Sequence, residues 1–121
     1  MITASKKFTD LRVWQEAHSL ALEVYNATKS FPATEQYTLA NQLRRASVSV
    51  SSNIAEGFNR FSRKEKIQFY SVALSSVSEV HSQLMLARDL QYLKPSDYGE
   101  LEAKIEVIHK ALVALIKSIR S

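Results

Sequence analysis

Glycine and proline are scarce in this chain, and their scarcity limits what the chain can fold into. The 121 residues include only two glycines and two prolines. An all-β fold needs many tight turns, and such turns depend on these two residue types. Apolar residues instead recur at three- and four-residue steps along nearly the whole sequence, which is the spacing of one face of a helix. The sequence therefore predicts an all-α fold.

Four segments carry this helical spacing. We expect helices at about residues 10–29, 33–57, 62–91 and from 97 onward. Ser62 and Glu65 have the spacing of a capping box at the start of the third helix, and Ser96 is the expected N-cap of the fourth. The links are short, so successive helices must run antiparallel. The sequence thus predicts an up-down-up-down four-helix bundle, formed by a single domain over 1–121 with an N-terminal extension at 1–9.

Composition also excludes several classes of protein. The chain has no cysteine, which rules out disulfides and thiolate metal sites and favours the reducing cytoplasm. The longest aliphatic run is six residues, at 111–116, whereas a membrane-spanning helix needs about 20. The N-terminus lacks the pattern of a secretory signal. We expect a soluble cytoplasmic protein.

Positive charge is concentrated in one stretch of the sequence. Two acidic residues lie between positions 44 and 66, Glu56 and Glu65. Six basic residues lie in the same stretch, and we take them as the candidate nucleic-acid-binding residues: Arg44, Arg45, Arg60, Arg63, Lys64 and Lys66. The balance of +4 equals the net charge of the whole chain. A partner attracted by charge should therefore meet this segment, or the end of the bundle that carries it.

Two parts of this stretch are candidate nucleic-acid-binding sites. One is a polar stripe with helical spacing, made by Arg45, Ser49, Ser52 and Glu56. It is either a phosphate-binding groove or a solvated or inter-subunit stripe in which Arg45 pairs with a carboxylate. The other is the basic cluster from Arg60 to Lys66, where free amides at the helix start add positive potential. A solvated loop explains this cluster equally well.

The segment Asn53-Ile54-Ala55-Glu56-Gly57 is interpreted as structural. Asn53 is expected to be a buried amide that fixes helix register, and Gly57 a close-approach or C-cap position. Glu56 is expected to orient Arg45 or an arginine of a neighbouring subunit. No partner acid, base or nucleophile accompanies Glu56, so no catalytic residue and no enzymatic activity are predicted.

The histidines do not predict a metal site. Glu106 and His109 have the Glu-x-x-His spacing of di-iron bundles, but the second copy that such sites require is missing. His18 and His81 fall on apolar stripes, where a hydrogen-bonded core histidine is the expected role. Tyr25 shares the core stripe with Trp14 and is expected to pack there. No metal and no cofactor are predicted.

Several helices are apolar on more than one side, which predicts subunit contacts. A second apolar face is expected on the third helix, and two residues, Val13 and Leu20, widen the stripe of the first. The additional face of the third helix comprises Val72, Leu86 and Leu90. The second helix has an additional face of small residues, which comprises Ala40, Ser47, Val48, Ser51 and Ala55. A single bundle needs one stripe per helix, so the excess favours a homo-oligomer over generous packing inside a monomer.

The sequence also resembles a known family. The motifs that carry the likeness are FTDLRVWQ at 8–15, FP at 31–32, QLRRA at 42–46 and NIAEG at 53–57. They are similar to the bacterial four-helix-bundle family of intervening-sequence proteins, named for members encoded within insertions in large-subunit ribosomal RNA genes. Relatives include the accessory variability determinant of diversity-generating retroelements. The chain departs from many members at three positions. Those members carry proline near the position of Ser51, and glycine near the positions of Ser75 and Gln91.

The resemblance implies an antiparallel bundle assembled as a ring-like homopentamer. It also implies a basic surface that, in the retroelement relatives, engages nucleic acid and a reverse transcriptase. We therefore expect a non-enzymatic oligomer that binds RNA or DNA phosphates as an accessory factor, with a reverse transcriptase or another protein as a further partner. The alternative is a protein-interaction scaffold whose arginines serve subunit assembly alone.

Overall fold

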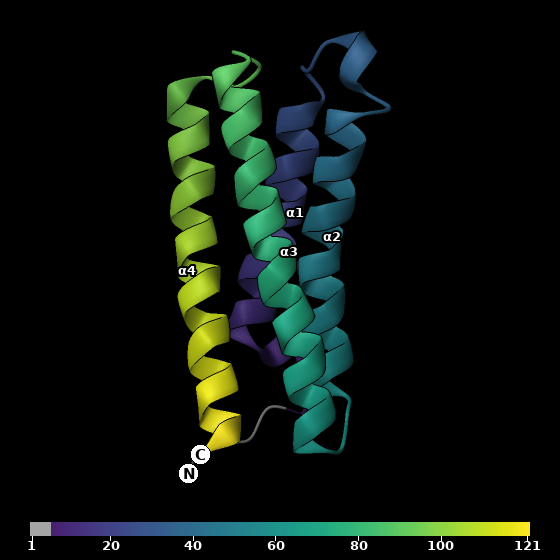
Figure 1. The fold of residues 1–121 in the computed structure, drawn as a ribbon, viewed down its shortest axis with the longest axis vertical. Helices are drawn as coiled ribbons and strands as arrows, with labels where there is room; N and C mark the ends of the chain where they lie inside the picture. The colour runs from purple at the N-terminus through teal and green to yellow at the C-terminus, as the bar shows by residue number, and fades with distance from the viewer. Residues whose placement is uncertain (1–5) are drawn as a thin grey trace.

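Four long antiparallel helices form the structure, a computed structural model that describes residues 6–121 (Figure 1). They are α1 (Arg12–Thr28), α2 (Leu39–Phe58), α3 (Arg63–Asp89) and α4 (Pro95–Arg120). Two short 3₁₀ helices precede α1 and α2, namely η1 (Phe8–Asp10) and η2 (Ala33–Glu35). Each long helix packs against the next, and α4 returns to pack against α1. The predicted up-down-up-down four-helix bundle is confirmed.

The core runs along the bundle axis and receives aliphatic side chains from all four helices. Residues that are completely or almost completely buried include Leu20, Leu43, Ile54, Leu84, Ile108 and Leu112. In α1 the core face is rotated from the expected one. Val13 and Leu20 are buried within the protomer, whereas His18 and Tyr25 are exposed. The expectations of subunit contact for the first pair and of core packing for the second were wrong.

The helix boundaries differ from the expected ones at two starts. The second helix does not continue from residue 33, because the backbone of Thr38 leaves the helical region at φ −118° and ψ −100°, which separates η2 from α2. The fourth helix begins at Pro95 with Lys94 as its N-cap, so the expected N-cap role of Ser96 was wrong. Proline suits the first helical position because its missing N–H would be unpaired there in any case.

Both ends of α3 have defined caps. The Ser62 hydroxyl accepts a hydrogen bond from the Glu65 amide at 3.1 Å, as predicted, and itself donates to the Glu65 carboxylate at 3.2 Å. At the other end, Gln91 has a φ of 66° and the Tyr92 amide donates to the Ala87 carbonyl at 2.9 Å. This left-handed closure of a helix is one that glycine usually occupies.

The described part of the expected N-terminal extension folds onto the bundle. The ring edge of Phe8 meets Trp14 with centroids 5.2 Å apart, and Gln15 donates to the Thr9 carbonyl at 2.9 Å. Residues 1–5 lie outside the described residues. Between residues 6 and 121, no helix is long and apolar enough to cross a membrane.

Only part of the predicted excess of apolar surface is accessible. Val72 and Leu86 of α3 and its C-cap residue Leu90 are 44–51% exposed. On the small-residue face of α2, only Val48 is well exposed, at 41%. The remaining members of that face are buried or half-buried inside the protomer: Ala40, Ser47, Ser51 and Ala55. The candidate subunit-contact surface is therefore smaller than the sequence suggested, and the oligomer stays a prediction.

Candidate nucleic-acid interface

The basic stretch predicted from the sequence divides into two groups in space. Arg44 and Arg45 lie in the first half of α2, whereas Arg60 follows the last residue of that helix. At 1.5 Å of rise per residue, the 14 steps from Arg44 to the end of α2 at Phe58 correspond to about 21 Å, and Arg60 lies two residues further on. The two groups therefore have to be judged separately.

Arg44 is engaged inside the protomer. Its Nε donates to the Thr28 hydroxyl at 2.9 Å and one of its terminal nitrogens donates to the Gln36 side-chain oxygen at 3.0 Å. Its guanidinium also lies over the Tyr25 ring, 5.6 Å from the centroid. These contacts join α2 to the end of α1 and to the segment after η2. The structure thus gives Arg44 a cross-linking role within the fold.

Arg45 is exposed in a polar groove between α2 and α3. The groove has a volume of about 450 Å³, and Tyr37 and Glu79 are among its lining residues. Within residues 6–121, Arg45 makes no ion pair. Glu79 brings negative charge to the same groove, so this region is less suited to phosphate than the isolated arginine suggested.

The predicted polar stripe does not form one surface. Ser49 faces α3, where its hydroxyl hydrogen-bonds that of Ser76 at 2.8 Å. The Asn53 amide donates to the Ser49 carbonyl at 2.8 Å and to its hydroxyl at 3.1 Å, so Asn53 supports this inter-helix contact from a half-buried position. Glu56 pairs with Arg60 at 2.8 Å, not with Arg45. Ser52 is exposed.

Two of the four cations in the second group are used by the α2–α3 junction. Arg60 pairs with Glu56 and lies over the Phe69 ring, 4.7 Å from the centroid. The Lys66 ammonium donates to the carbonyls of Phe58 at 2.7 Å and Gly57 at 3.3 Å. Carbonyls at a helix C-terminus lack partners within the helix, so Lys66 caps α2 with its side chain.

Gly57 allows the close approach of α3 to α2. A Cβ added there would lie 2.7 Å from Cε1 and 2.9 Å from Cδ1 of Tyr70, whose side chain is buried. Such distances are too short for ordinary packing. Of the two roles expected for Gly57, the structure supports close approach, because the residue lies inside α2.

Arg63 and Lys64 are the exposed cations of the junction. Both belong to the first turn of α3, and among the described residues neither makes an ion pair. Free amides at this helix start add positive potential beside them. Of the six predicted binding residues, Arg63 and Lys64 are therefore the two best placed for an external anion.

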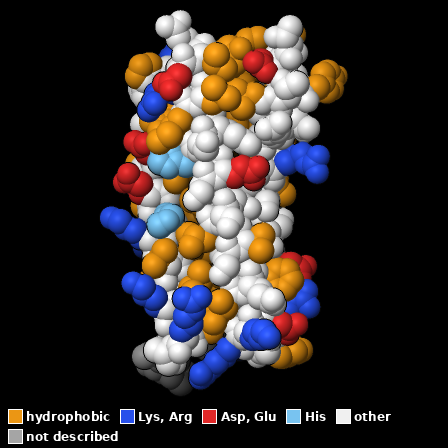
Figure 2. Space-filling model, in the orientation of Figure 1, with side chains coloured by type: hydrophobic (Ala, Val, Ile, Leu, Met, Phe, Trp, Pro, Cys, Tyr) orange, Lys and Arg blue, Asp and Glu red, His pale blue; other side chains and the backbone are white. Residues whose placement is uncertain are grey.

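Two further cations at this end were missed in the sequence analysis. Lys117 and Arg120 are exposed in the last turn of α4, which lies at the same end of the bundle as the α2–α3 junction (Figure 1). In Figure 2, which shows the molecule in the orientation of Figure 1, Lys and Arg side chains gather in the lower half. The bundle topology itself was the signal, because it places the end of the fourth helix beside the start of the third. We call Arg63, Lys64, Lys117 and Arg120 the basic end.

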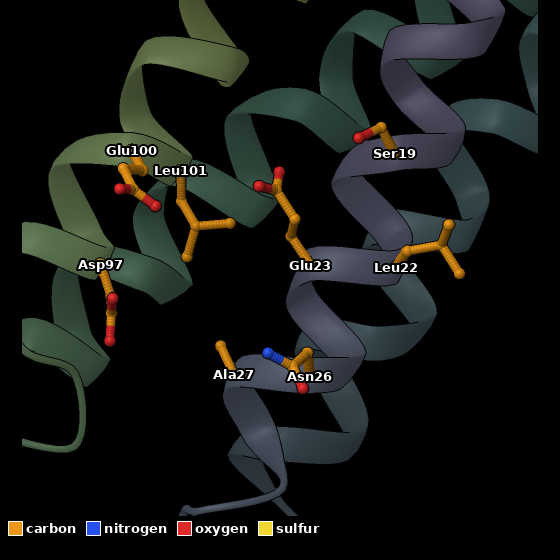
Figure 3. Close-up of a pocket in the computed structure, with 8 residues that line it drawn as sticks. All are labelled: Ser19, Leu22, Glu23, Asn26, Ala27, Asp97, Glu100 and Leu101. Carbon is orange, nitrogen blue, oxygen red and sulfur yellow. The ribbon is translucent and has the colours of Figure 1, made fainter.

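An acidic groove lies nearer the opposite end of the bundle. It has a volume of about 280 Å³ and lies between α1 and α4, with Glu23 on one wall and Asp97 and Glu100 on the other (Figure 3). The Lys104 ammonium lies 3.4 Å from Glu23 and donates to the Ser19 hydroxyl at 2.9 Å. Three carboxylates against one lysine make this groove unsuited to phosphate.

Of the two histidines expected in the core, His81 is hydrogen-bonded but only half-buried, whereas His18 is exposed. The exposed ring of His18 stacks on Trp14 at 4.8 Å. His81 is half-buried and lies 3.0 Å from the Glu102 carboxylate, which also accepts a hydrogen bond from Tyr98 at 2.8 Å. These bonds, that from Tyr98 foremost, lower the pKa of Glu102. Over residues 6–121, no three metal-binding side chains come together.

The fold and the basic end together define a class, the small helical bundles with a positively charged pole. Residues 9–114 match the family model of the 23S rRNA-intervening sequence proteins. The chain belongs to this family.

Two other comparisons complete this result. A crystal structure of a protein of unknown function from the S23 ribosomal protein family of Bacteroides thetaiotaomicron is similar, with a TM-score of 0.81 and 24% sequence identity. The similarity covers 87% of this chain and 95% of that one, and it supports the fold. No curated protein matches the sequence.

Proposed function

We propose that this protein is a non-enzymatic accessory factor that binds RNA or DNA phosphates through its basic end. The observation that carries the proposal is the group of four exposed cations from two helices, none of which makes an ion pair within residues 6–121. Lysine and arginine contacts to phosphates supply most sequence-independent affinity for nucleic acids. Contacts of these four cations to phosphates carry no sequence information, so we expect little sequence preference from them.

Assembly would strengthen such a surface. We expect a homo-oligomer, as the family resemblance implies a pentamer, with contacts that include the exposed face of Val72, Leu86 and Leu90. In a ring each basic end is repeated around the axis, so that a weakly charged pole becomes a concentrated positive field. An accessory role beside a larger polymerase, such as a reverse transcriptase, or a ribonucleoprotein fits a binder without sequence preference.

Salt dependence tests the proposal. Binding of a labelled 30-nucleotide RNA and its DNA counterpart is measured by anisotropy at several salt concentrations. We expect a log-log slope of roughly 0.7 to 0.9 per displaced ion and a lower affinity and slope for the double variant Arg63→Glu and Lys64→Glu. The matched control reverses Lys29 and Lys94, which are exposed at the opposite end. Equal losses in both variants, or no loss in either, would overturn the proposal.

A second function is favoured by the exposed apolar face of α3. If Val72, Leu86 and Leu90 contact another protein, the chain is an interaction scaffold and its cations need bind no nucleic acid. Light scattering coupled to size exclusion, with and without the RNA, distinguishes the two functions. An oligomer that ignores RNA at every salt concentration would support the scaffold.

A further inference from the structure

Surface depressions follow one another along the outer side of α4 next to α3, and we call them together the seam groove. The three depressions have volumes of about 430, 390 and 180 Å³; the first and last lie between α3 and α4, and the middle one is lined by α4 alone. The first two share His109 and Lys110, and the last two share Val113 and Lys117. From Ile105 to Arg120, α4 contributes 15 residue steps, so the groove is about 22 Å long.

The floor of this seam groove is aliphatic. Val77, Ile105 and Ile116 are buried beneath it, while Leu74 and Val113 are only partly covered. No Phe, Tyr or Trp lines the three depressions, and their aromatic rings are the imidazoles of His81 and His109. An aliphatic floor suits the apolar face of a helix, whereas single-stranded nucleic acid usually needs aromatic side chains on which its bases stack.

The rim of the seam groove is basic on one side. Lys110, Lys117 and Arg120 are exposed on α4, and within residues 6–121 none of them makes an ion pair. Glu106 is the one acidic residue that lines the groove, and the α3 wall offers the neutral hydroxyls of Ser71 and Ser78. The seam groove as a whole therefore attracts a negatively charged partner.

The spacing of the rim cations matches a helical partner. Lys110 and Lys117 are seven residues apart, which is two turns or about 10.5 Å on one side of α4. Carboxylates seven residues apart on a second helix have the same spacing, as in the charged pairs that flank a coiled-coil seam. A four-turn helix is about as long as the groove.

We propose that the α3–α4 seam groove binds an acidic amphipathic helix of a partner protein. The apolar face of that helix covers the aliphatic floor, and its flanking carboxylates pair with Lys110 and Lys117. The seam groove shares Lys117 and Arg120 with the basic end, but Arg63 and Lys64 do not line it, so variants at those two residues separate this inference from nucleic-acid binding.

A designed peptide tests the inference. The probe is a labelled 21-residue peptide with leucine at the a and d positions of three heptads and glutamate at e and g. Mutual repulsion of the glutamates discourages self-association at neutral pH. The control peptide has the same composition, with the leucines spread around the helix. We expect saturable binding of the first peptide only, with NMR shift changes of the Val77 and Val113 methyl groups.

Charge reversal on the rim gives the second measurement. In the double variant Lys110→Glu and Lys117→Glu, two attractive pairs become repulsive, and we expect about tenfold weaker binding of the peptide. Both lysines are exposed, so the fold should persist. Reversal of Lys29 and Lys94, the matched control, should leave peptide binding unchanged. So should reversal of Arg63 and Lys64, even where RNA binding is lost.

Several results would overturn the inference. One is the absence of saturable binding up to about 1 mM peptide, and another is equal binding of the control peptide. A third is unchanged binding when Lys110 and Lys117 are reversed. If a 15-nucleotide single strand displaces the peptide and loses its own binding in the rim variant alone, the seam groove serves nucleic acid and the protein-partner inference is wrong.

Discussion

The two ends of the bundle are closed in different ways. At the α2–α3 junction and the last turn of α4, within residues 56–66 and 117–120, six basic residues face two acidic ones. At the opposite end, within 28–39 and 88–100, three basic residues face four acidic ones. The opposite end is held by side-chain contacts between loops and helices, such as the hydrogen bond from Tyr92 to Glu35 at 2.9 Å. The junction is held by the close approach of α3 to α2 at Gly57, and its cations Arg63 and Lys64 make no ion pair among the described residues.

The comparison shows that a cation cannot be judged by type alone. Arg44 and Arg45 are adjacent in the sequence, yet one cross-links the opposite end and the other is exposed. Lys64 and Lys66 differ in the same way, because only Lys66 caps α2. A cation is available to an external anion only where it makes no hydrogen bond or ion pair within the fold. The pairs Arg44/Arg45 and Lys64/Lys66 provide matched variants that test this distinction.

The largest stability effect is expected at Arg44. The Arg44→Ala variant loses hydrogen bonds to Thr28 and Gln36, and we expect it to lower the free energy of unfolding by about 2–3 kcal/mol. The matched Arg45→Ala variant should change stability by less than about 0.5 kcal/mol because its side chain is exposed. Urea denaturation of both variants checks this. Similar losses in both would mean that Arg44 does not cross-link the opposite end.

The next largest effect is expected at Gly57. In Gly57→Ala the new methyl group would clash with Tyr70, and we expect a loss of about 1–2 kcal/mol after the better helix propensity of alanine is counted. Gly99 provides the control at the opposite end, because an added Cβ there meets nothing within 4 Å. Gly99→Ala should therefore stabilise the protein by about 0.5–1 kcal/mol. Thermal unfolding compares the two, and a stable Gly57→Ala would contradict close packing at the junction.

Lys66 and Lys64 should separate stability from binding. Lys66→Met keeps the aliphatic stem but loses the bonds to two carbonyls at the end of α2, at an expected cost of about 1 kcal/mol. Lys64→Met should leave stability within about 0.5 kcal/mol but weaken RNA binding at low salt. Denaturation and anisotropy are measured on both variants. If Lys66→Met weakens RNA binding more than Lys64→Met, the capping lysine also contacts RNA.

The sequence was sufficient for the fold and insufficient for the site. Helical spacing and scarce turn residues predicted the number and direction of the helices, because burial of one apolar stripe per helix is a local property of the sequence. The fate of each arginine depends on partners elsewhere in the chain. Arg44 meets Thr28, 16 positions away, and Lys117 joins the basic end through the topology alone. Local spacing contains no information about such partners.

The rotation of the α1 core face has the same origin. Both Leu20 and Tyr25 are apolar enough for the core, and helical spacing alone allowed either stripe. Packing against α2 and α4 selected the stripe of Val13 and Leu20, and this leaves Tyr25 at the surface, where the Arg44 guanidinium covers it.

A smaller gain is expected at Gln91, at the opposite end. Its φ of 66° strains a residue with a side chain, and glycine adopts this conformation without strain. We expect Gln91→Gly to raise the free energy of unfolding by about 0.5 kcal/mol, since the greater freedom of glycine in the unfolded chain offsets part of the gain. Gln91→Ala keeps the strained φ with a shorter side chain and should gain nothing. Equal stability of both variants in urea would show that the strain is negligible.

The smallest effect concerns pH and is again specific to the opposite half. Hydrogen bonds from Thr38 and Tyr92 lower the pKa of Glu35, and those from Tyr98 and His81 lower that of Glu102. A carboxylate with a lowered folded pKa stabilises the fold above its unfolded pKa of about 4.5, and this contribution disappears as the pH falls through the folded value.

We therefore expect Glu35→Gln and Glu102→Gln to flatten the loss of stability with acid below about pH 4.5. Urea denaturation between about pH 3 and pH 6 measures this slope. Glu100→Gln is the control, because Glu100 accepts no side-chain hydrogen bond among the described residues. If all three variants keep the wild-type slope, carboxylates elsewhere govern acid unfolding. The opposite half would then be no more sensitive to acid than the basic end.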